Sequence, residues 1–76
     1  MFIREMKLIY SDDNKRVYKT IFQKKEFGEI EIDKNTKEPK VIKPIGFRDS
    51  WFLGRAIQLL EFSDNDERAK YNISIS

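Results

Sequence analysis

The stretch Ser50-Trp-Phe-Leu-Gly-Arg-Ala-Ile-Gln-Leu-Leu-Glu-Phe62 decides how this chain folds, because at about 100° per residue it winds into a helix with two apolar stripes. One stripe holds Phe52, Leu53, Ala56, Ile57, Leu59 and Leu60. The other, called here the Trp51–Phe62 stripe, holds Trp51, Arg55, Gln58 and Phe62. A helix needs only one apolar face to join a core, so the second stripe predicts either a binding surface or a face covered by another part of the chain.

Residues on both sides of this helix carry the alternation typical of β-strands. Apolar and polar residues alternate over residues 2–10, and β-branched and aromatic residues dominate residues 16–23. Residues 16–23 have apolar side chains on both faces, which predicts a central strand. The sequence does not decide which of these two faces is buried. In the third run Ile30 and Ile32 are expected to point inward, with the intervening glutamates pointing outward. The sequence predicts strands at residues 2–10, 16–23, 27–32, 40–43 and 71–76.

These elements predict a small α+β fold, in which an antiparallel sheet of four to five strands (ββββα plus a terminal strand) packs on one amphipathic helix. The 76 residues are expected to form a single domain, residues 1–76, because so short a chain cannot divide its core in two. With 39% hydrophobic and 37% charged residues, the composition favours a folded, soluble chain over disorder. No apolar run resembles a signal peptide or a membrane span, so we expect a cytoplasmic protein that contacts no membrane.

The chain has neither histidine nor cysteine, which excludes imidazole bases, imidazole or thiolate metal sites, and disulfides. Carboxylate, Lys, Tyr, Ser and Thr side chains remain. Catalysis built from these groups usually needs a deeper cleft than one helix on a small sheet provides. The three glycines are too widely separated to form a phosphate-binding loop. We therefore expect no catalytic residues, no cofactor and a protein that is not an enzyme.

Two acidic clusters begin like a calcium loop. Asp64-Asn65-Asp66 lacks the glycine that such a loop needs at its sixth position, and Asp12-Asp13-Asn14 runs directly into two basic residues. Both clusters are therefore predicted to be solvated turns and helix caps, and no metal site is expected.

Basic residues concentrate in the predicted sheet, since residues 15–48 carry ten Lys or Arg and five Asp or Glu. On one sheet face they could neutralise phosphates, with Tyr18 or Phe22 stacking on the bases of a single strand. The alternative is an ordinary soluble face of interleaved Lys and Glu whose edge lysines discourage aggregation. The residues predicted for a nucleic-acid-binding face are Lys19, Lys24, Lys25, Lys40, Lys43 and Arg48.

The Trp51–Phe62 stripe leads to the main functional hypothesis, because Trp and Arg often dominate the binding energy of protein interfaces. It predicts a non-enzymatic interaction protein of the regulator or inhibitor type, and it would also serve a homodimer. Frequent Lys, Ile, Asn and Asp with two Ala suggest an AT-rich source such as a phage or another mobile element. The alternative is internal packing, with Ile45-Gly46-Phe47 over Trp51 and the tail residues Tyr71, Ile73 and Ile75 on Phe62. Gly54 is expected to allow close approach of another backbone, or else to mark a binding surface.

Overall fold

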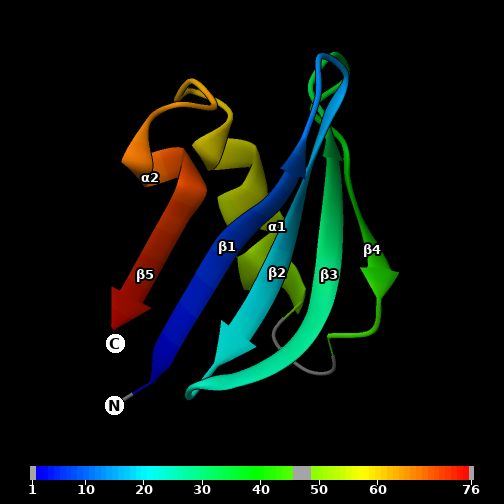
Figure 1. The fold of residues 1–76 in the computed structure, drawn as a ribbon. Coiled ribbons are helices and arrows are strands. Elements are labelled where there is room, and N and C mark those ends of the chain that lie inside the picture. Colours follow the sequence, from blue (N-terminus) through cyan, green and yellow to red (C-terminus); the bar gives the residue numbers. More distant parts are fainter. Residues whose placement is uncertain (1, 46–48, 76) are drawn as a thin grey trace.

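The computed structural model of the chain describes residues 2–45 and 49–75. These residues form an antiparallel five-stranded sheet with one main helix and one short helix, and the sheet is not closed into a barrel (Figure 1). No described helix is long and apolar enough to cross a membrane. In chain order the elements are β1 (Ile3–Ser11), β2 (Lys15–Phe22), β3 (Lys25–Asp33), β4 (Pro39–Lys43), α1 (Asp49–Leu59), α2 (Glu67–Lys70) and β5 (Tyr71–Ile75).

The predicted α+β class is confirmed, and the strands lie in the order β4-β3-β2-β1-β5. β2 is the central strand, as its apolar residues on both faces predicted. Short hairpins join the first four strands, and β5 returns after the helices to pair with β1. Figure 1 shows α1 behind one face of the sheet and β5 beside β1 at one edge. The face turned away from α1 is called the open face.

The main buried cluster lies between α1 and the sheet, and β2 has buried residues on both of its faces. Tyr18 and Thr20, on the helix side, have no exposed surface, and Val17 and Ile21, on the open face, are 8% exposed. Ile30 and Ile32 point inward as predicted, and both are fully buried. The buried cluster consists of Met6, Tyr18, Ile30, Ile32, Ile45, Phe52, Ala56 and Leu59.

Helix α1 is shorter than the sequence predicted, and one of its predicted core residues is exposed. It ends at Leu59, and Leu60, Glu61 and Phe62 form a turn held by backbone hydrogen bonds to Ile57, Gln58 and Leu59. Ile57 was predicted to face the core, but it is 41% exposed. The helical spacing of apolar residues placed Ile57 on the core side, but the described part of α1 packs on the core mainly through Phe52, Ala56 and Leu59.

The glycine that permits close backbone contact is Gly28, not Gly54. A Cβ on Gly28 would lie 2.3 Å from the carbonyl oxygen of Pro44 and 2.4 Å from that of Lys43. The prediction that Gly54 allows close approach of another backbone is wrong for the described residues, because a Cβ there would meet no atom beyond its own helix turn within 4 Å. The backbone after β4 therefore passes directly over Gly28 in β3, a fit that only a residue without a side chain allows.

Arg16 in β2 ties the segment after α1 to the sheet. Its guanidinium is almost fully buried and donates from Nε to Asp64 Oδ1 (2.7 Å) and from Nη1 to the carbonyl oxygen of Leu59 (2.8 Å). The Phe62 carbonyl oxygen accepts from Nη2, which satisfies the turn that ends the helix. Nearby, the hydroxyl of Tyr18 accepts from Arg16 and donates to the Ala69 carbonyl oxygen (2.8 Å). One buried cation thus fixes where residues 59–69 lie.

Asp64 collects three donors and makes the fold sensitive to acid. Hydrogen bonds from Lys34 Nζ and Ser11 Oγ, and then from Arg16, hold the pKa of the Asp64 carboxyl well below its ordinary value of 3.8. A carboxyl whose pKa is lower in the folded than in the unfolded chain stabilises the fold above pH 4. That stabilisation is lost as the pH falls further toward the folded pKa.

We expect Asp64→Asn to be less stable than the wild type at pH 7 and to approach it as the pH falls from 4 to 2. Over this range the Asp64 carboxyl of the unfolded wild type becomes protonated while that of the folded chain stays ionised to lower pH, so the stabilisation from its charge-assisted bonds shrinks. The urea midpoint at pH 7, 4, 3 and 2 measures this convergence. Asp13→Asn, at an exposed turn position, is the control and should follow the wild type throughout. A constant gap between Asp64→Asn and the wild type at every pH would contradict this role of Asp64.

Candidate functional site

A cleft of about 430 Å³ opens between α1, α2 and β5. Three members of the Trp51–Phe62 stripe lie in its wall, which places most of the predicted protein-binding residues at one hollow. Arg68 of α2 and Asn72 of β5 complete the opposite side. The residues that line the cleft are Arg55, Gln58, Leu59, Glu61, Phe62, Arg68 and Asn72.

Arg55 is one of two cations that line this cleft, and neutral groups hold it in place. Its Nε donates to Asn72 Oδ1 (2.7 Å) and its Nη1 to Gln58 Oε1 (2.9 Å). None of the ion pairs among the described residues includes Arg55. Its side chain is therefore positioned by amide oxygens while its charge stays available to an anion, which guanidinium groups bind with defined geometry.

Arg68, on the other side of the cleft, is already paired. It donates from Nη2 to Asp66 Oδ2 (2.7 Å) and from Nε to Asp66 Oδ1 (3.0 Å), and its guanidinium carbon lies 4.3 Å from the centre of the Phe62 ring. Hydrogen bonds from the Arg68 side chain and backbone N–H lower the pKa of Asp66 to about 2. Phe62 is thus covered on one side by a cation that is itself neutralised, which leaves Arg55 as the better anion contact.

Trp51 lies away from the cleft and packs against the core. Its ring meets Phe52 edge-on at a centroid distance of 5.1 Å, and the guanidinium of Arg4 lies 5.3 Å from its centre. Ile45, expected to cover it, is buried in the same core, whereas Gly46 and Phe47 lie outside the described residues. The stripe therefore divides into Trp51, which is half-buried on the core, and the cleft residues Arg55, Gln58 and Phe62.

The tail does not cover Phe62 in the way that the packing alternative supposed. Asn72 faces the helix and holds Arg55, whereas Tyr71, Ile73 and Ile75 alternate with it and are exposed. The side chain seen over Phe62 is Arg68 of α2, a contact that strand alternation in the tail does not predict. Sequence reasoning did not assign Leu59, Glu61, Arg68 and Asn72 to this site. The helix-facing position of Asn72 could have been found from the alternation within residues 71–76.

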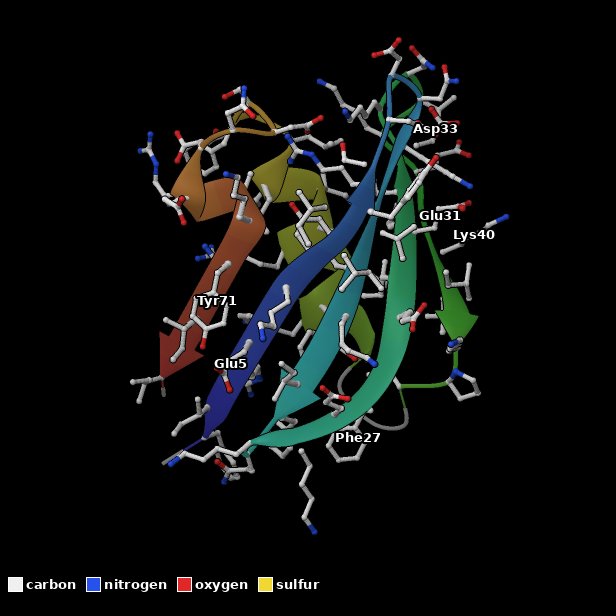
Figure 2. All side chains as sticks on the ribbon, in the orientation of Figure 1. Glu5, Phe27, Glu31, Asp33, Lys40 and Tyr71 are labelled. Atoms are coloured by element: carbon white, nitrogen blue, oxygen red, sulfur yellow. The ribbon has the colours of Figure 1, made fainter. Side chains whose placement is uncertain are left out.

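Three of the lysines predicted to bind nucleic acid form ion pairs with glutamates. On the open face Lys40 Nζ lies 3.5 Å from Glu31 and Lys43 Nζ 3.2 Å from Glu29, and Figure 2 shows Lys40 beside Glu31. Lys19 pairs with Glu26 at 3.3 Å. Lys24 and Lys25 are exposed at the β2–β3 turn without a described ion pair, and Arg48 lies outside the described residues.

The prediction that Tyr18 stacks on a base is wrong, because this side chain is fully buried in the core. Phe22 is partly buried against the same core, and its ring stacks on that of Phe2 at a centroid distance of 5.9 Å.

The acidic clusters act mainly as the predicted turns and caps. Asp12 accepts from the backbone N–H groups of Asn14 and Lys15, and Asp66 caps the N-terminus of α2. Asp64 departs from this prediction, since it pairs with buried Arg16 and with Lys34. Among residues 2–45 and 49–75, no group of three or more acidic side chains could hold a metal ion.

The fold and the site define a small antiparallel α+β protein with a helix on one face of the sheet and a cleft between α1, α2 and β5. No protein-family model, no curated protein and no solved structure matches this chain.

Proposed function

We propose that this chain is a non-enzymatic interaction protein that binds a protein partner at the cleft between α1, α2 and β5. The observation that carries the proposal is Arg55, held by Asn72 and Gln58 in the wall of a 430 Å³ cleft without an acidic partner among the described residues. The partner would place an acidic side chain against Arg55 and an apolar group against Phe62. Arg and aromatic residues of this kind are frequent centres of protein interfaces.

The biological setting of the proposal follows from composition. We infer a cytoplasmic regulator or inhibitor, encoded by a phage or another mobile element, because the chain is small, lacks cysteine and has an AT-rich residue bias. An inhibitor needs no catalytic group, which is consistent with a chain that has no histidine or cysteine.

Binding of single-stranded nucleic acid is the second candidate and has less support. Lys19, Lys40 and Lys43 have carboxylate neighbours that reduce their attraction for phosphates. Lys24 and Lys25 are the cations that this candidate would depend on.

The test compares charge reversals at the two candidate sites. A photo-crosslinking residue at Gln58, with Ile42 on the opposite edge as the control position, would capture a partner in a lysate of the cells that encode the protein. Affinity for the purified partner is then measured for the wild type, for Arg55→Glu, and for Lys24→Glu combined with Lys25→Glu. We expect Arg55→Glu to weaken binding roughly 30-fold or more, as removal of a central interface residue does, and the lysine variant to bind like the wild type.

Two outcomes would overturn the proposal. One is equal affinity of Arg55→Glu and the wild type, with circular dichroism showing both to be folded. The other is a crosslinked product that nuclease destroys, together with loss of binding in the lysine variant. That result would indicate that the protein binds nucleic acid.

A further inference from the structure

Strand β5 leaves one edge of the sheet open and carries no charge. It pairs with β1 on one side, and among the described residues no strand pairs with its other side (Figure 1). Its residues are Tyr71, Asn72, Ile73, Ser74 and Ile75. Tyr71, Ile73 and Ile75 are 42%, 48% and 58% exposed. An uncharged edge strand with exposed apolar side chains offers free backbone N–H and C=O groups to another strand.

The opposite edge is protected against such pairing. β4 begins at Pro39, which has no backbone N–H to donate, and it carries Lys40 and Lys43. Proline and lysine on an edge strand are the usual means by which proteins prevent association between edges. The two edges therefore differ in chemistry, and only β5 is built to accept a neighbour.

We propose that two copies of this chain pair through β5, antiparallel about a twofold axis at Ile73, and so join their sheets into one of ten strands. In this register Ile73 faces Ile73 of the second copy, and Tyr71 faces Ile75. On the helix side Asn72 faces Ser74. Every cross-strand pair is then apolar with apolar or polar with polar, and no like charges meet, which is what an isologous interface requires.

On the open face, the residues of β1 opposite Ile75, Ile73 and Tyr71 are Ile3, Glu5 and Lys7, of which Ile3 extends the apolar contact. Ile75 lies opposite Ile3 of β1, and Ile73 lies opposite Glu5, which accepts a hydrogen bond from the Tyr71 hydroxyl. Figure 2 shows Tyr71 close to Glu5 on neighbouring strands. The one acidic group in this area is thus engaged within its own copy. Of the residues that line the proposed cleft, only Asn72 belongs to β5, so a change at Arg55 leaves the side chains of the paired strand itself unaltered.

The first experiment measures the mass in solution as a function of concentration by sedimentation equilibrium. We expect a wild-type dimer, and we expect Ile73→Lys to raise its dissociation constant roughly tenfold or more, because two lysines would meet at the axis. The matched control is Ile42→Lys, which makes the same change at a side chain 41% exposed on β4. It should leave the dimer unchanged. Circular dichroism and thermal melting confirm that each variant is folded.

The register has its own test, because the natural chain contains no cysteine. In Ile73→Cys the two introduced side chains would lie about 4.5–5.5 Å apart across the axis, close enough to form a disulfide on mild oxidation. In Ile75→Cys they would lie about 14 Å apart, because each is two residues from the axis. We expect rapid crosslinking of the first variant and little of the second.

A wild type that stays monomeric up to millimolar concentration would overturn the proposal, whatever binds in the cleft. It would also be overturned if Ile42→Lys raised the dissociation constant as much as Ile73→Lys does, or if Ile75→Cys formed its disulfide as fast as Ile73→Cys. If Arg55→Glu no longer binds the partner but still forms the dimer, then partner binding and dimer formation are separate properties, and each proposal can fail without the other.

Discussion

Replacing Arg16 by Met is expected to lower the free energy of unfolding by about 3–5 kcal/mol, the usual cost of removing one member of a buried ionic network. The side chain keeps similar bulk, but the carbonyl oxygens of Leu59 and Phe62 and one oxygen of Asp64 lose their donor. A domain of this size rarely has more than about 3–5 kcal/mol in total. The variant should therefore be largely unfolded at 25 °C, as urea titration followed by circular dichroism would show.

Arg16→Lys is the matched variant for this prediction. It keeps the charge, but its compact ammonium cannot supply the planar set of donors that reaches Asp64 and both carbonyl oxygens at once. We expect an intermediate loss of stability. If Arg16→Met unfolds at the same urea concentration as the wild type, the buried guanidinium does not hold the segment from Leu59 to Ala69 in place.

The second large effect is expected for Gly28→Ala, which should lower the free energy of unfolding by about 1–3 kcal/mol, as overpacking typically does. The new methyl group would occupy space within 2.4 Å of two backbone oxygens, at Lys43 and Pro44. Backbone atoms cannot move aside as a flexible side chain can, so the end of β4 must shift away from β3. The urea midpoint, followed by the fluorescence of Trp51, measures the loss.

Gly54→Ala makes the same chemical change where the described structure leaves room for it. No atom beyond its own helix turn lies within 4 Å of the added Cβ, and alanine is about 1 kcal/mol more favourable than glycine inside a helix. We expect the midpoint to rise in this variant and to fall in Gly28→Ala. Two shifts of the same sign would contradict the assignment of the close backbone contact to Gly28.

Local patterns in the sequence were sufficient to find the strands and the main helix. The alternation over residues 2–10 and 71–76 and the helical spacing from Trp51 onward depend only on backbone geometry, which gives strands a period of two and helices one of 3.6. Errors of one to three residues occur at the ends, as where α1 stops at Leu59 instead of Phe62. There the carbonyl groups are bound by Arg16, a residue more than forty positions away in the chain.

The sequence also indicated part of the candidate site. Arg55, Gln58 and Phe62 share a helix face by spacing alone, and all three line the cleft. Trp51 shares the same spacing, but it packs on the core. Its position there depends on contacts with Arg4 in β1, which helical periodicity cannot reveal.

By itself, then, the sequence determined the elements of this protein, its α+β class, the central place of β2 and three residues of the helix stripe. Tertiary structure alone decided that β5 lies beside β1, that Asn72 and Arg68 close the cleft, and that Arg16 reaches Asp64. The reason is physical: periodicity is set by neighbouring residues along the backbone. The pairing of side chains far apart depends on which elements pack together once the core is buried.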